Sequence, residues 1–214
     1  MSGIVVYAVA TGKQRPLRGS MEVGSLTVVA APMASPPSPS VAAMRAHDRA
    51  VRRASKSYAS VIPFRFGAWF ESESSMADSV LAMQRRLKDA LKLVRDREQM
   101  TCRLFDARTR TAPPARRSSR SGASTGTTYL LERAQALREP EALDVLRRAL
   151  KSIVRSERVE LHGTGTLLAT VFHLVDRGAS RDYARALRRV ALAIAPLTLL
   201  ASGPWAPYAF TEAS

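Results

Sequence analysis

The sequence predicts an α+β protein of two domains, a small N-terminal α+β domain over residues 1–98 and a ferredoxin-like domain over residues 99–214. Stretches with an apolar residue at every third or fourth position alternate along the chain with short runs of β-branched residues. The length of 214 residues is enough for two compact domains. The second half has the order strand, helix, strand, strand, helix, strand, which is the βαββαβ arrangement of ferredoxin-like domains.

The first half begins with two expected strands, at residues 3–10 and 25–31, joined by a loop. Four prolines within residues 32–40 exclude a helix or a central strand there, and Ser40 is a suitable N-cap residue. A helix is expected over residues 41–56, because apolar residues recur there at helical spacing. The positions expected on its buried face are Val41, Met44, Val51 and Ala54.

The same helix carries His47 and Asp48, which are neighbours in sequence and therefore point about 100° apart. This angle excludes an acid–base pair between them. We expect both side chains on the helix surface, with Asp48 bonded to Arg52 one turn later.

The rest of the first half predicts a strand and a helix. Residues 58–70 are rich in aromatic and β-branched types, but Pro63 has no N–H and Gly67 has no side chain, which favours an edge or bulged strand. Ser75 and Asp78 have the spacing of a capping box, so a helix is expected from there to about Arg97. Its expected apolar face consists of Met76, Val80, Met83, Leu87, Leu91 and Val94.

The second half starts with an expected strand and a basic loop. Residues 99–106 alternate in the manner of a strand, and residues 107–127 contain five arginines and no acid, which predicts a flexible, positively charged loop. A helical region is expected from Tyr129 to about Val154, interrupted at Pro140. The remaining expected elements are strands at residues 157–163, 166–176 and 197–202 and a helix at residues 180–195.

The charge and the cysteine content restrict the class of protein. Thirty-three basic residues against eighteen acidic ones give a net charge of +15, divided almost equally between the two halves. This even division favours a generally cationic surface over a dedicated nucleic-acid arm. A single cysteine, a start without a basic signal region, and a longest apolar stretch too short to cross a bilayer favour a cytoplasmic protein without a membrane span.

Residue patterns for catalysis or cofactor binding are missing from the sequence. One cysteine and three widely spaced histidines do not form a zinc motif, and the glycines of residues 121–128 and 162–166 lack the other residues of nucleotide-binding loops. Cys102 lies in an apolar strand without a neighbouring histidine, so we expect a buried structural thiol. The expectation is no enzymatic activity, no cofactor, no metal and no small-molecule substrate.

Nucleic-acid binding is the alternative function. A ferredoxin-like sheet with exposed aromatic rings can stack RNA bases, and the basic surface would bind phosphates. The candidate rings of the second domain are Phe105 and Phe172, and an aromatic residue on a strand more often belongs to a core. We therefore treat RNA binding as the less favoured hypothesis.

Four short motifs occur in an order that resembles the gas vesicle protein F/L family (GvpF/GvpL) over most of the chain. The segment Ile62–Gly67 (IPFRFG) follows the helical AHDRAV run and is similar to the family's L-P-x-R-F-G strand. Gly126, Tyr129, Leu130 and Arg133 reproduce a G-x-x-Y-L-x-x-R pattern. Residues 202–210 (SGPWAPYAF) are similar to the family's T-G-P-W-P-P-Y-S-F ending, with alanine at positions 206 and 209.

The resemblance implies a non-enzymatic role in gas vesicle formation. It implies an assembly factor or minor structural protein of the gas vesicle that associates with the small hydrophobic shell subunit and with other accessory proteins. A shell subunit that forms an apolar surface must be kept from aggregating before it joins the wall.

Two segments are candidates for contact with such a partner. The first is an aromatic strand whose edge could accept a partner strand, and the second is a proline-rich turn at the end of the chain. For both segments the alternative is a purely structural role, in which the rings fill the first domain's core and Trp205 packs over the domain boundary. The candidate partner-binding residues are Pro63, Phe64, Arg65, Phe66, Trp69, Phe70, Trp205 and Tyr208.

Overall fold

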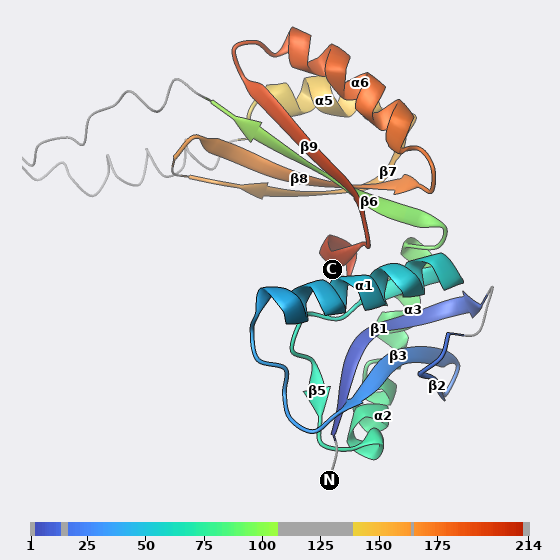
Figure 1. Cartoon of the computed structure of the whole chain (residues 1–214). Helices are drawn as coiled ribbons and strands as arrows, with labels where there is room; N and C mark the ends of the chain where they lie inside the picture. Colours follow the sequence, from blue (N-terminus) through green and yellow to red (C-terminus); the bar gives the residue numbers. More distant parts are fainter. Residues whose placement is uncertain (1–2, 14–16, 107–138, 164, 212–214) are drawn as a thin grey trace, which may run out of the picture. The chain divides into compact units, whose positions relative to one another are not determined.

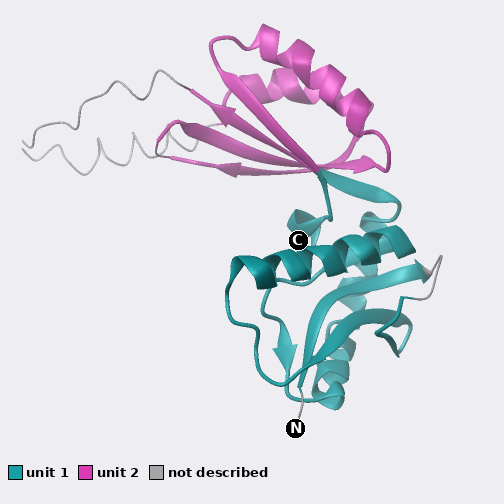
Figure 2. Cartoon of the chain, in the orientation of Figure 1, with its two compact units in different colours: residues 1–99, 204–214 teal, residues 100–203 magenta. Residues whose placement is uncertain are grey.

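The computed structural model describes residues 3–13, 17–106, 139–163 and 165–211. The chain forms two compact units, one of residues Met1–Gln99 with Pro204–Ser214 and one of residues Met100–Gly203 (Figure 2). The sequence-based division instead assigns all of residues 99–214 to the second domain. The tail groups with the first unit because the Ala209 N–H donates a hydrogen bond to the Gln99 side chain (2.8 Å) and because Phe210 is buried.

An antiparallel sheet forms the centre of the first unit (Figure 1). Its strands follow the order β2-β3-β1-β4, and the two-residue strand β5 also pairs with β1. The strands are β1 (Gly3–Lys13), β2 (Ser20–Val23), β3 (Leu26–Met33), β4 (Tyr58–Pro63) and β5 (Trp69–Phe70). The loop expected between the first two strands is therefore wrong in part, because β2 forms a hairpin with β3 there.

The single strand expected over residues 58–70 is also wrong, because it is divided in two. β4 and β5 pair with different parts of β1, and residues 64–68 turn between them. The backbone of Gly67 has φ +93°, a conformation that side-chain-bearing residues rarely adopt, so glycine allows the chain to leave the strand at this point.

The α-helices among the described residues of the first unit are α1 (Val41–Ser57), α2 (Glu73–Ala82) and α3 (Gln84–Leu93). The expected N-cap is confirmed, since the Ser40 hydroxyl accepts a hydrogen bond from the Ala43 N–H (3.1 Å). The expected capping box at Ser75 is wrong, because the box joins Ser72 and Ser75 and the helix starts earlier. The expected continuous helix breaks at Met83, where α2 ends and α3 begins.

The sheet of the first unit is covered on both faces, with α1 on one face and α3 on the other (Figure 1). β1 is therefore buried along most of its length. On α1 the buried residues are His47, Ala50, Val51 and Ala54. Val41 and Met44 were expected in this buried face but are 66% and 50% exposed, because they lie in the first turn and beside the edge of the packed stripe.

Among its described residues, the second unit follows the element order strand, helix, strand, strand, helix, strand. Its sheet has the strand order β7-β8-β6-β9, and α5 and α6 lie on the same face of the sheet (Figure 1). The elements are β6 (Arg97–Phe105), α5 (Ala142–Leu150), β7 (Val154–Leu161), β8 (Leu167–Asp176), α6 (Ser180–Ala193) and β9 (Thr198–Trp205). The expected basic loop at residues 107–127 and the expected helix start at Tyr129 lie outside the described residues.

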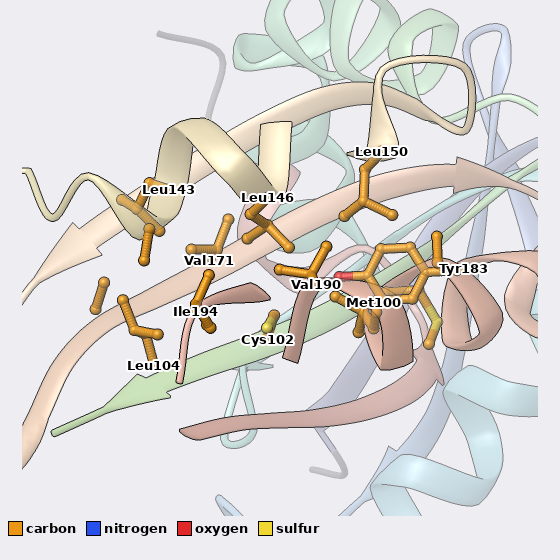
Figure 3. Close-up of a cluster of buried hydrophobic side chains, with 14 of the residues drawn as sticks. Met100, Cys102, Leu104, Leu143, Leu146, Leu150, Val171, Tyr183, Val190 and Ile194 are labelled. Carbon is orange, nitrogen blue, oxygen red and sulfur yellow. The ribbon is translucent and has the colours of Figure 1, made fainter. Parts of the chain in front are cut away.

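The core of the second unit lies between these helices and the sheet (Figure 3). Leucines of α5 and the apolar side of α6 point toward β6 and β8. Cys102 of β6 is fully buried there, as expected, and burial raises the pKa of its thiol to about 12. Such a thiol is uncharged and unreactive at neutral pH.

The prediction of a mixed α and β protein is confirmed, with two antiparallel sheets and helices packed on them. None of the helices that the structure describes combines the length and the hydropathy needed to span a bilayer.

Candidate partner-binding surface

Helix α1 is the element that connects the candidate residues. Its residues His47 and Asp48 are adjacent, Arg52 lies one turn later, and each is held by a specific contact. The expected ion pair is confirmed, because the Arg52 Nε–H donates to the Asp48 carboxylate at 2.7 Å. The expected surface position of His47 is wrong, since this side chain is 6% exposed.

His47 fixes the turn between β4 and β5 onto α1. Its Nε2–H donates a hydrogen bond to the Phe64 carbonyl (3.0 Å). The imidazole also lies edge-on to the rings of Tyr7 and Phe66, at centroid distances of 5.5 and 5.8 Å. Burial lowers the pKa of His47 from its ordinary value of 6.5, although the Phe64 carbonyl and the charge of Asp48 act in the opposite direction. The neutral, hydrogen-bonded ring is therefore the form that the fold favours.

The turn itself is held by backbone hydrogen bonds. The Phe64 N–H donates to the Tyr7 carbonyl (2.9 Å), and the Ala68 N–H donates to the Arg65 carbonyl (3.3 Å). Phe64 and Phe66 are half-buried in this arrangement and Arg65 is exposed. The two phenylalanines thus present part of each ring to solvent from a well-anchored backbone.

Trp69 and Phe70 of β5 have a more structural position. The Trp69 Nε1–H donates to the Met33 carbonyl (3.1 Å), and the indole lies so close to Gly3 that any side chain at position 3 would collide with it. Phe70 pairs with Ile4 in the sheet. These two residues close the end of the first sheet, and both are half-buried.

The C-terminal segment brings a second aromatic pair to α1. The Arg52 guanidinium lies 5.2 Å from the ring centre of Trp205, within the range of a cation–π contact. Trp205 and Tyr208 are 39% and 37% exposed. Burial of the phenol oxygen, and then the negative charge of Asp48, raises the pKa of Tyr208 to about 12, so that its hydroxyl stays protonated.

Phe210 anchors this segment and was missed by the sequence analysis. It lies in the short 3-10 helix η2 (Tyr208–Phe210), is 1% exposed, and its N–H donates to the Pro207 carbonyl (3.0 Å). Together with the Gln99–Ala209 hydrogen bond, it fixes the direction in which Trp205 and Tyr208 emerge. The signal available in the sequence was a large apolar residue directly after a proline-rich turn.

The structure therefore brings the candidate residues into two groups that share α1. Phe64 and Phe66 meet α1 through His47, and Trp205 and Tyr208 lie beside Arg52 and Asp48. We call the four residues Phe64, Phe66, Trp205 and Tyr208, together with Arg52 of α1, the aromatic surface. Pro63 is the last residue of β4, and Trp69 and Phe70 form β5.

The expected open edge at β4 is only partly available. β4 is the last strand in the sheet order, but the Ala59 carbonyl already accepts a hydrogen bond from the Asp96 N–H (2.8 Å). All six residues of β4 are buried. A partner strand that paired with β4 would have to displace contacts within the first unit. Binding of a partner through exposed side chains is therefore more accessible than strand addition.

Potential catalytic groups occur in the second unit but are enclosed. The Tyr183 hydroxyl lies 2.7 Å from His173 Nδ1, and His173 Nε2 lies 3.0 Å from the Glu157 carboxylate. This order of hydroxyl, imidazole and carboxylate resembles a catalytic triad. Tyr183 and His173 are 0% and 1% exposed, however, and burial raises the pKa of the Tyr183 hydroxyl far above its ordinary value. The three groups form a structural network in which Tyr183 and His173 are buried and Glu157 reaches the surface.

Metal-binding clusters of three or more histidine, cysteine or carboxylate side chains do not occur among the described residues. Phe105 and Phe172, the rings considered for RNA stacking, are half-buried on β6 and β8.

Comparison with known proteins gives one family and a set of similar folds. The family model described as gas vesicle synthesis protein GvpL/GvpF matches residues 3–212. The fold is similar to the crystal structure of gas vesicle protein GvpF from Anabaena sp. PCC7120, with a TM-score of 0.76 and 15% identity over 100% of this chain and 98% of that one. The crystal structure of GvpF from Microcystis aeruginosa has a TM-score of 0.76 and 13% identity, and the match covers 100% of both chains. None of the curated proteins compared with the chain matches it.

Proposed function

The chain belongs to the gas vesicle synthesis protein GvpL/GvpF family, and from this premise we propose that it is an assembly factor or minor structural protein of the gas vesicle. The single observation that carries the proposal is the family match over residues 3–212, which confirms the resemblance of the four sequence motifs. The site of action is then the gas vesicle. The comparisons give no support to the nucleic-acid alternative.

We also propose that the second unit is a ferredoxin-like domain. Its element order is βαββαβ, and its strand order β7-β8-β6-β9 places the first and third strands side by side in the middle of the sheet. The proposed domain boundaries are those of the two compact units, with the C-terminal tail as part of the N-terminal domain.

Contact with the hydrophobic shell subunit is proposed to occur through the aromatic surface. Large half-exposed rings on a fixed backbone can bury apolar area without losing much conformational entropy. The rings of this surface are held by His47, Arg52 and Phe210 before any partner arrives. The remaining candidate residues, Pro63, Arg65, Trp69 and Phe70, would support this contact from the strands and the turn.

A non-catalytic role is proposed because the one triad-like group of the described residues is enclosed by the core. A substrate cannot reach Tyr183 or His173 without unfolding the second unit. Binding, rather than chemistry, is what the exposed groups of the first unit can provide.

Capture of the purified shell subunit by the immobilised chain tests the proposal. Because the contact is expected to be apolar, capture should persist at high salt. The double variant Trp205→Ala/Tyr208→Ala should lower capture by about tenfold or more, since it removes two rings from the proposed contact. Phe66→Leu, which keeps an apolar side chain beside His47, should have a smaller effect.

The matched control is Leu192→Ala, which removes an apolar side chain that is 83% exposed in the second unit. Far-UV circular dichroism and urea midpoints establish that each variant is folded. Equal capture by the double variant and the wild type would contradict the aromatic surface. Salt-sensitive capture of RNA without capture of the shell subunit would contradict the gas vesicle role.

A further inference from the structure

Two hollows of almost equal size lie on opposite faces of the first unit's sheet. The hollow on the α1 side has a volume of about 300 Å³, and the hollow on the α3 side about 310 Å³. We call them the α1-side pocket and the α3-side pocket. Residues that line the α1-side pocket include Tyr7, Arg18, Val29, Ala31, Ala50 and Arg53. Residues that line the α3-side pocket include Thr11, Ser60, Lys88, Leu91, Lys92 and Arg95.

Both pockets have basic rims, but their charges differ. In the α3-side pocket, two of the three cations are paired, Lys92 with Asp89 (3.2 Å) and Arg95 with Asp96 (3.7 Å), and Lys88 alone forms no ion pair with a described residue. In the α1-side pocket, neither Arg18 nor Arg53 forms an ion pair with any residue that the structure describes. The α1-side pocket therefore has two cations whose charge is not neutralised within the described part of the first unit.

The positive charge of this pocket continues along α1. Helical spacing places Arg45, Arg49, Arg53 and Lys56 on one exposed side of the helix. The helix contains one acid, Asp48, and that carboxylate is already bound by Arg52. A negatively charged ligand at the pocket would thus be attracted by a row of cations and would meet no competing carboxylate on α1.

The floor of the α1-side pocket is apolar. Val29 and Ala31 of β3 and Ala50 of α1 supply aliphatic groups, and Val29 and Ala50 belong to the buried core. The Tyr7 ring at the pocket is engaged edge-on with His47, so it is not available as a stacking platform for bases. An aliphatic floor between two arginines suits a ligand with an apolar side chain beside acidic groups.

We propose that the α1-side pocket binds an acidic segment of a partner protein, with one aliphatic side chain in the pocket and carboxylates on Arg18 and Arg53. The cationic side of α1 extends the contact to neighbouring acids of the same segment. This binding site is separate from the aromatic surface and does not depend on the proposed function. It gives a specific role to part of the charge excess of the chain.

The test uses the full-length protein and a short fluorescein-labelled peptide with glutamates on both sides of one leucine. Fluorescence anisotropy gives the affinity at low and at high salt. Arg53→Glu and Arg18→Glu should each weaken binding by about tenfold or more, because charge reversal turns an attraction into a repulsion. A peptide with serine in place of leucine should bind several-fold more weakly.

Lys88→Glu is the matched control, since it makes the same charge change at a pocket of nearly the same volume in the same unit. We expect it to alter the affinity by less than about twofold. Arg53→Gln, which removes the charge without reversing it, should give an intermediate loss and guards against misfolding of the reversal variant.

Three outcomes would overturn the proposal. An equal loss in Lys88→Glu would mean attraction to the whole surface rather than to one pocket. Unchanged affinity in Arg53→Glu would exclude the pocket. Tighter binding of a labelled RNA oligonucleotide, with the same sensitivity to Arg53→Glu, would identify the pocket as a nucleic-acid contact. Because the shell subunit is not in the assay, none of these outcomes bears on the proposed gas vesicle role.

Discussion

Arg53 of the first unit and Arg147 of the second each lie in the C-terminal half of a basic, amphipathic helix, but their surroundings differ. Arg147 donates to Glu139 (2.7 and 3.1 Å) and to Glu157 (2.8 Å), and Glu157 in turn contacts the buried His173. Arg53 lies at a pocket without an ion pair among the described residues. Identical residue types are therefore used for internal stability in one unit and left available for binding in the other.

The difference shows that a count of charged residues does not reveal which of them form ion pairs within the fold and which remain available to a partner. Both halves of the sequence carry a similar basic excess. In the second unit, a carboxylate from a neighbouring strand reaches the arginine, so the pair crosses from α5 to β7. In the first unit, neither β1 nor β3 contains an aspartate or a glutamate that could pair with an arginine of α1. The acids of the neighbouring elements determine which cations remain for a partner.

Of the changes considered, removal of Glu157 should have the largest effect on the difference between the two units, because Glu157 binds Arg147 in the second unit. Glu157→Ala leaves His173 and Arg147 without their shared acceptor, so we expect the free energy of unfolding of the second unit to fall by about 2 to 3 kcal/mol. Exposure of the Cys102 thiol in urea measures this unit, because Cys102 is the single cysteine and is buried there. Asp182→Ala, which removes the exposed pair with Arg185, is the control and should cost less than about 0.5 kcal/mol. Equal losses would mean that the network adds no stability beyond a surface pair.

On acidification, the two units should lose stability at different pH values. His47 has a folded-state pKa below its ordinary value of 6.5, so on acidification the unfolded first unit takes up this proton before the folded one does. The first unit should therefore lose stability from about pH 6.5 downward. The Glu157 pKa is lowered below 4.5, mainly by the hydrogen bond with His173, so its contribution is present above about pH 4.5 and is lost as pH falls through the folded-state value.

Tryptophan fluorescence measures the first unit in this experiment, since Trp69 and Trp205 both belong to it and the chain has two tryptophans. Urea midpoints between about pH 7 and about pH 5 should decline in the wild type and decline less in His47→Gln. The glutamine can still donate to the Phe64 carbonyl but does not titrate. A parallel decline in both proteins would show that another group is responsible.

The smallest expected difference is between two neighbouring arginines of α1. Arg52→Ala removes the Asp48 ion pair and the contact with Trp205, which should lower the stability of the first unit by about 0.5 to 1 kcal/mol. Arg53→Ala should change it by less than about 0.5 kcal/mol, because no ion pair with a described residue is lost. Thermal unfolding followed by tryptophan fluorescence measures both. A larger effect for Arg53→Ala would mean that this side chain has a structural role.

The helices and strands with strong hydrophobic periodicity could be predicted from the sequence. The short strand β2 and the break between α2 and α3 could not. Tyr183, Leu187 and Val190 of α6 and Ile194 directly after it recur at helical spacing in the sequence, and all four are buried. The short strand β2 was missed because four residues are too few for alternation to be recognised. The break at Met83 was missed because its apolar side chain continues the helical spacing while the backbone leaves the helix.

The aromatic residues of the aromatic surface could be predicted from the sequence, but their positions relative to α1 could not. Phe64 and Trp205 are more than a hundred residues apart in sequence, and only the fold shows that α1 lies next to both. The buried position of His47 could have been predicted, because it precedes Ala50 and Val51 by three and four residues on the apolar stripe. Whether Arg53 pairs with any described acid depends on which acids are near in space, and no spacing rule provides that information.

The first unit takes its strands and helices from one end of the chain and its last turn from the other, with residues 100–203 between them. During synthesis the second unit therefore leaves the ribosome before the first unit is complete. The hydrogen bond between Gln99 and Ala209 and the burial of Phe210 cannot form until residues 204–210 have emerged as well. Until then the Arg52 guanidinium has no indole ring to contact, so the surface of the first unit is completed only after the whole second unit has been synthesised.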